Sequence, residues 1–169
     1  MGTKQNFICL FFLVFGQIVA FGMGGQAEPF TEGILKKFSV DQLKQADFFL
    51  KNELVLTRVV PHGVNIGVDG GTLTIVNGET IETIRIPTDV KGKLISVNKS
   101  KVVISFSPNH LNRTLLFSEE LIGTEYFLVA GSTVKYGDYD YKVNRKPKLL
   151  VLFNDQFNRE RTSETETGW

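Results

Sequence analysis

The sequence predicts a mainly β protein: an antiparallel β-sandwich or small barrel of about eight strands, with one N-terminal amphipathic α-helix packed on it. Three observations support this fold class. Short segments of alternating apolar and polar residues follow one another after Glu53, Asn-Gly and Gly-Asp pairs mark tight turns, and one segment alone has helical spacing. The sequence shows no alternation of strands with helices and no internal repeat, so a parallel sheet is not expected.

The helical pattern begins near Ser39. Ser39 is a preferred N-cap residue, and Gln42 three residues later completes a capping box. From Leu43 onward, apolar residues recur at spacings of three and four residues, as in an amphipathic helix. The sequence therefore predicts a helix over about residues 40–51.

Strands are expected from the point where the apolar period changes to two. The predicted strands cover residues 54–59, 72–76, 84–86 with the residues leading into them, 93–97, 101–106, 113–117, 125–130, both arms of a hairpin over 132–143, and 148–153.

Asn77-Gly78 is the strongest hairpin signal of the chain. A three-residue loop with a glycine bulge would place Leu73, Ile75 and Ile81 on one face of the sheet. A two-residue turn would separate Ile81 from the other two. Because one buried apolar face usually sets the register, we expect the three-residue loop.

Gly137-Asp138 fits a two-residue turn with glycine in the first position. This turn sets Tyr136 opposite Tyr139 and brings Tyr141 to the same face. The other face is charged, with Lys135 opposite Asp140, so local chemistry and register agree.

Tyr136, Tyr139 and Tyr141 are the candidate binding residues. Exposed tyrosines can stack on sugar rings or contact a partner protein, because each combines apolar area with a hydroxyl. Val134 and Val143 share the face, however, and this favours the alternative that it is the core side of the hairpin.

Residues 1–27 have the pattern of a signal peptide. Lys4 precedes an apolar run, and the run ends in small residues, with Ala27 at the expected cleavage position. The alternative is an uncleaved membrane anchor, since the run approaches the roughly 20 residues that span a bilayer. Gln17 and several glycines weaken the second interpretation, and Cys9 lies too early in the run for a lipoprotein signal.

The rest of the chain divides into a linker over residues 28–38, the helix and β-domain over 39–154, and a polar tail over 155–169. After removal of the leader, 18 basic residues balance 18 acidic ones, because Lys4 is lost. A neutral domain has no electrostatic reason to bind nucleic acid. The same part has no cysteine, so disulfides and thiol chemistry are excluded.

Motifs for catalysis or cofactor binding are not found. His62 and His110 lie in predicted loops without other ligands at metal-binding spacing, so no metal site is expected. The glycine-rich segment 63–71 lacks the Lys-Ser/Thr of a phosphate loop and leads into a strand. Two carboxylates such as Asp69 and Asp89 could meet on folding, but the pattern does not single them out.

These observations predict an exported, non-catalytic β-domain that contacts a protein of the envelope or of a membrane complex. It would be periplasmic, at the cell surface or secreted, and would touch the membrane only if residues 7–25 are retained. One alternative is a module that binds a glycan or a small apolar molecule. A second is a hydrolase with a dispersed carboxylate site. No cofactor is expected.

Overall fold

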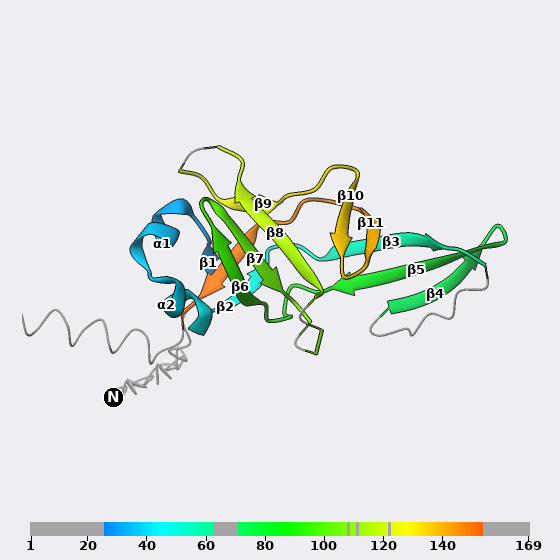
Figure 1. Cartoon of the computed structure of the whole chain (residues 1–169), viewed down its shortest axis with the longest axis horizontal. Helices are drawn as coiled ribbons and strands as arrows, with labels where there is room; N and C mark the ends of the chain where they lie inside the picture. The colour runs from blue at the N-terminus through cyan, green and yellow to red at the C-terminus, as the bar shows by residue number, and fades with distance from the viewer. Residues whose placement is uncertain (1–25, 63–70, 108, 111, 122, 154–169) are drawn as a thin grey trace, which may run out of the picture.

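The computed structural model describes residues 26–62, 71–107, 109–110, 112–121 and 123–153 (Figure 1). Within these residues the chain is mainly β, as expected, and its strands form three antiparallel sheets. The elements in chain order are β1 (Glu28–Pro29), α1 (Glu32–Lys37), α2 (Val40–Gln45), β2 (Asp47–Leu50), β3 (Leu54–Val60), β4 (Gly71–Val76), β5 (Glu79–Ile86), β6 (Lys93–Asn98), β7 (Lys101–Ser105), β8 (Thr114–Glu119), β9 (Tyr126–Leu128), β10 (Thr133–Tyr136), β11 (Tyr139–Val143) and β12 (Leu149–Leu152).

The three sheets have the strand orders β1-β12-β2, β10-β11-β3-β5-β4 and β6-β7-β8-β9. Isolated bridges join the three-stranded and four-stranded sheets at two places, Phe48 with Gly92 and Phe127 with Lys148. Among the described residues these sheets do not form a closed barrel. The expectation of about eight strands is too low, since the described residues form twelve, and the short strands β1 and β2 lie in segments predicted as linker and helix.

One apolar core joins the sheets. Phe30, Phe48, Phe117 and Tyr126 are fully buried in it. Phe30 packs edge-on against Tyr126 and Phe48, with ring centroids 4.9 and 5.5 Å away. Burial of an aromatic side chain of this size contributes roughly 1.5–3 kcal/mol, so each of these rings adds substantially to stability.

The predicted linker over residues 28–38 is instead part of the fold. Its first residues form β1, which pairs with β12, and α1 follows with Thr31 as N-cap. The backbone of Phe30 also pairs with Leu149 and Tyr126, at 2.9 and 3.0 Å. The fully buried side chain of Phe30 anchors this segment in the core.

The predicted helix over residues 40–51 is correct only in its first half. α2 begins after Ser39 with the expected capping box, but it ends at Gln45. The following residues form β2, whose buried Phe48 and Leu50 alternate with less buried neighbours and pair with β12. Pairing with a strand about 100 residues later in the chain outweighs the local helical spacing.

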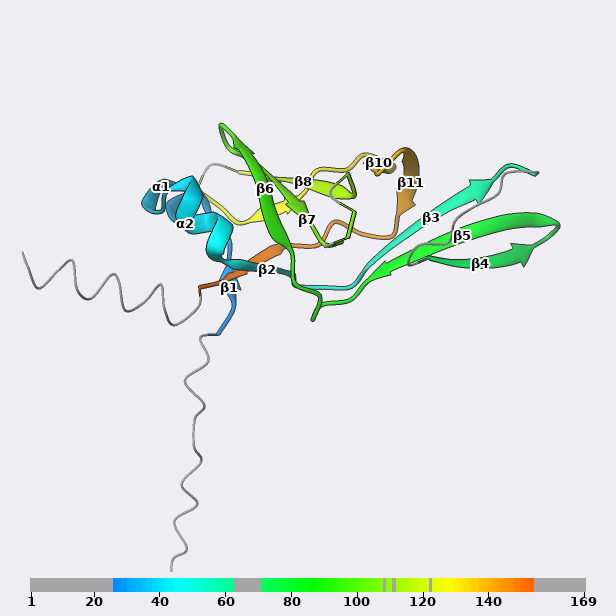
Figure 2. The same cartoon turned by 60° about the horizontal axis from the view of Figure 1, so that its bottom comes forward.

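β3, β5 and β4 project from the body, and we call these three strands the arm (Figures 1 and 2). The three-residue loop expected at Asn77-Gly78 is wrong. Val76 pairs with Glu79, and both turn residues have positive φ, 51° and 82°, as a two-residue type I′ turn requires. Because β4 is exposed along nearly its whole length, the turn rather than burial sets its register.

The other strand predictions agree with the structure within two residues at each end. The β10–β11 hairpin has the expected register, with Tyr136 opposite Tyr139 and a positive φ at Gly137. Most of the predicted leader and the tail over 155–169 lie outside the described residues. None of the described helices has the length and apolar character needed to span a membrane.

Candidate functional site

The β10–β11 hairpin separates the three candidate tyrosines by environment. Tyr136 and Tyr141 are buried, at 4% and 2% exposure, and belong to the core. Tyr139 is 47% exposed. The hairpin therefore offers one accessible tyrosine ring, and the three rings do not form an exposed stacking platform of the kind that glycan binding would use.

Tyr141 belongs to a polar cluster where the hairpin meets the arm. Arg58 on β3 and Glu82 on β5 are paired directly across the strands, and the Arg58 Nε donates to Glu82 Oε2. The Tyr141 hydroxyl donates to the same oxygen at 3.0 Å. The Arg58 guanidinium lies over the Tyr139 ring, 3.6 Å from its centroid. We call these four residues the arm cluster.

Three of the four side chains of the arm cluster are buried, and its charges compensate each other. The side chains of Arg58 and Glu82 are 9% and 4% exposed. Burial disfavours the charge of Arg58, but the hydrogen bond and charge of Glu82 outweigh it, so the pKa of Arg58 is raised. Burial and the Glu82 carboxylate likewise raise the pKa of Tyr141. This arrangement keeps Arg58 charged and Tyr141 protonated, and it ties the arm to the hairpin.

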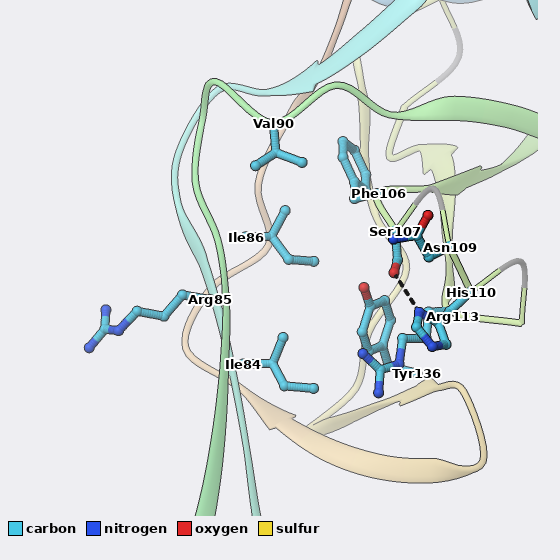
Figure 3. Close-up of a pocket in the computed structure, with 10 residues that line it drawn as sticks. All are labelled: Ile84, Arg85, Ile86, Val90, Phe106, Ser107, Asn109, His110, Arg113 and Tyr136. Atoms are coloured by element: carbon cyan, nitrogen blue, oxygen red, sulfur yellow. Dashed lines mark hydrogen bonds between the residues drawn. The ribbon is translucent and has the colours of Figure 1, made fainter. Parts of the chain in front are cut away.

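A cavity of about 270 Å³ lies beside Tyr136, between β5, β10 and the chain that links β7 to β8 (Figure 3). It is lined by Ile84, Arg85, Ile86, Val90, Phe106, Ser107, Asn109, His110, Arg113 and Tyr136. Figure 3 shows the side chains of Ile84, Ile86 and Val90 on one side of the cavity, facing Tyr136 and Arg113 on the other. We call this space the Tyr136 cavity.

The polar side of the Tyr136 cavity is built from a short segment after β7. His110 lies close to Ser107, with 3.4 Å between His110 Nδ1 and Ser107 Oγ. The aliphatic part of the Arg113 side chain lies near Gly137 of the hairpin turn. Arg85 points out of the cavity in Figure 3 and pairs with Glu53 at 3.3 Å.

The arm carries an exposed apolar surface. Ile75 is 78% exposed, Val59 and Val76 are each 51% exposed, and Leu73 is 38% exposed. These residues lie on both faces of the arm, since Val59 shares a face with Ile81 while Leu73 lies opposite Glu82. β4 itself, Gly-Thr-Leu-Thr-Ile-Val, has no charged side chain.

The residues expected to carry chemistry are dispersed. His62 is exposed, and His110 lines the Tyr136 cavity. Within the described ranges no three His, Cys, Asp or Glu side chains come together as a metal site would need. Asp69 lies outside the described residues.

Two further cavities bear on the hydrolase interpretation. One of about 550 Å³ lies between β8 and β10, and one of about 370 Å³ lies between α1 and the β6–β7 turn. Among the described residues that line the three cavities, the single carboxylate is that of Glu32. The pair of carboxylates that a dispersed hydrolytic site needs is not formed by these residues.

Neither the arm cluster nor the Tyr136 cavity was visible in the sequence. Arg58 and Glu82 are 24 residues apart, and the two-residue register at Asn77-Gly78 together with the pairing of β3 and β5 is needed to place them opposite each other. The cavity draws its residues from three separate segments. Comparisons with protein-family models, with curated proteins and with solved structures gave no match for this chain.

Proposed function

We propose that this chain is an exported, non-catalytic β-domain protein, and that its arm binds a partner protein of the envelope by adding a strand to β4. The observation that carries the proposal is the uncharged, apolar edge strand on a projecting arm. The leader pattern at residues 1–27 supports export, and the absence of cysteine after the leader suits an exported domain that folds without disulfides.

β4 has a free pairing edge within the described part of the chain. Its one neighbour there is β5. In an antiparallel hairpin with a two-residue turn, the pair that closes the turn is hydrogen-bonded, and from there consecutive residues alternate between bonding to the partner strand and pointing away from it. Since Val76 and Glu79 close the turn, the backbone groups of Leu73 and Ile75 point away from β5. An extended partner can pair with them.

The other edges of the described sheets are short, charged or covered. β1 has two residues, β10 carries Lys135, and β6 begins with Lys93 and packs against α2. The edge of β2 is bridged by Gly92, with hydrogen bonds of 3.0 and 2.7 Å. Proteins protect edge strands from unwanted pairing by such means. β4 has neither a charged residue nor a proline, so its free edge lacks this protection, as expected of a strand that pairs with a partner.

The chemistry of β4 defines its partner. Leu73 and Ile75 lie on one face and Thr72, Thr74 and Val76 on the other, so an added strand would meet apolar and hydroxyl side chains on both faces. β4 offers no charge for an ion pair. We therefore assign the partner as an extended, uncharged protein segment rich in β-branched or aromatic residues, which pack well beside such neighbours.

Site-specific photo-crosslinking in the producing cell tests this proposal. A benzophenone side chain at Val76 should yield one discrete heterologous adduct, and a second change, Ile75→Lys, should abolish it because the edge becomes charged. Leu121→Lys is the matched control, since Leu121 is 72% exposed but lies on the β8–β9 connection. An adduct of two copies of this chain, or one that survives Ile75→Lys, would contradict the proposal.

A further inference from the structure

We infer that the Tyr136 cavity is a binding site for a small organic acid, with the apolar body against Ile84 and Ile86 and the carboxylate at the Tyr136 hydroxyl. This site lies at the base of the arm and does not involve β4, so it is independent of the partner-binding proposal. The inference rests on the shape and the polarity of the cavity, on the hydroxyl of one buried tyrosine that lines it, and on the charge around that hydroxyl.

The cavity has two chemically different sides. Ile84, Ile86 and Val90 form an apolar side, and the first two are 4% exposed. Tyr136 and Arg113 face them across the cavity in Figure 3. Small-molecule sites are concave and mainly apolar, with a few polar groups that fix the orientation of the ligand. The volume of about 270 Å³ suits a compact molecule rather than a lipid chain or an oligosaccharide.

The Tyr136 hydroxyl is the polar group that points to a ligand. Tyr136 is 4% exposed, yet within the described part of the chain no group forms a hydrogen bond with its hydroxyl. The hydroxyl is not sealed in protein, unlike that of Tyr126, because it lines the cavity. Because this hydroxyl opens onto the cavity, the molecule that fills the cavity, water or ligand, is the acceptor of its hydrogen bond.

The charge around the hydroxyl favours an anion. None of the ten described lining residues is acidic, and the Arg113 guanidinium lies near Tyr136. Burial raises the pKa of Tyr136, although Arg113 opposes this, so the hydroxyl keeps its proton and donates. A carboxylate accepts a hydrogen bond from the hydroxyl and is attracted by the positive charge of Arg113, whereas a neutral amide gains much less from that charge.

The test is titration of the purified protein with phenylacetate and hexanoate, observed by two-dimensional NMR, with phenylacetamide and hexanamide as neutral counterparts. We expect at least one acid to shift the resonances of Ile84, Ile86 and Tyr136, and its amide to bind about tenfold or more weakly. No shifts with either acid at millimolar concentration, or equal binding of acid and amide, would overturn the inference.

Tyr136→Phe links the effect to the hydroxyl. This variant removes no hydrogen bond within the described chain, so its urea midpoint should match that of the parent protein. We expect it to weaken binding of the acid about tenfold or more, in line with the loss of a hydrogen bond to a charged group. Tyr139→Phe, which removes an exposed hydroxyl outside the cavity, should leave binding unchanged. Equal affinities for the two variants would contradict the assignment.

Discussion

Removal of one partner from the arm cluster should strongly destabilise the protein. Glu82→Gln leaves the Arg58 guanidinium buried, at 9% exposure, without its countercharge. Loss of one member of a buried ion pair costs about 3–5 kcal/mol, because the remaining charge has given up water without compensation. We therefore expect Glu82→Gln to lower the free energy of unfolding by about 3 kcal/mol or more.

Substitution of the buried hairpin tyrosines should change the free energy of unfolding by smaller amounts than Glu82→Gln does. Tyr141→Phe removes the 3.0 Å hydrogen bond to the Glu82 carboxylate and should cost about 1.5–3 kcal/mol, as hydrogen bonds to charged groups do. Tyr136→Phe is the matched control, since it also removes one hydroxyl from a buried ring on the same hairpin. Because that hydroxyl has no partner within the described chain, the change should stay within about 0.5 kcal/mol of the parent.

Urea unfolding followed by circular dichroism measures all three free energies. A double variant, Arg58→Met with Glu82→Leu, should recover most of the loss, because an apolar pair of similar volume leaves no buried charge. Equal losses for Tyr141→Phe and Tyr136→Phe, or a loss below about 0.5 kcal/mol for Glu82→Gln, would refute the reasoning that the arm cluster ties the arm to the body.

Three further changes have defined outcomes. Tyr126→Phe should raise stability in urea by about 1 kcal/mol, because its enclosed hydroxyl has no partner among the described residues. Gly78→Ala should speed amide exchange in β4 about tenfold, because φ is +82° at this position and strains an alanine. Gly131→Ala is the control and should not change the exchange, since Gly131 also has open space around it but no positive φ. Partial burial opposes the charge of Asp47, but hydrogen bonds from two lysines hold its pKa below the usual value. A carboxyl with a lowered pKa stabilises the fold at pH values above its unfolded pKa of about 3.9, and this stabilisation is lost on acidification. In urea unfolding, Asp47→Asn should therefore cost about 1 kcal/mol at pH 7 and much less at pH 3.

The hairpins could be predicted from the sequence because their turns are encoded locally. Gly137-Asp138 fixes the register of β10 and β11, and the alternation of charge and aromatic residues agrees with it. The turn residues Asn77-Gly78 also encode the register of their hairpin, but the assumption that Ile81 shares a buried face with Leu73 and Ile75 led to the wrong loop length. β4 is exposed along nearly its whole length, so burial carries little register information there. β2 was missed for the opposite reason, since its strand form depends on distant β12.

The candidate sites were less predictable than the strands. The three tyrosines were located correctly on one face of the hairpin, but burial divides them into two core residues and one exposed ring. That division depends on how far the hairpin overlaps the body, which local spacing does not encode. The Tyr136 cavity combines β5, β10 and the segment around His110, so it requires the tertiary fold.

The central claim, strand addition at β4, is tested most directly by residue-resolved amide hydrogen exchange in the free protein and in complex with the partner identified by crosslinking. The amides of Thr72 and Thr74 point toward β5 and should be protected in both states. The amides of Leu73 and Ile75 point away from β5 and should exchange rapidly in the free protein and become protected on binding. Protection of a different surface, with Leu73 and Ile75 still exchanging rapidly in the complex, would contradict the account.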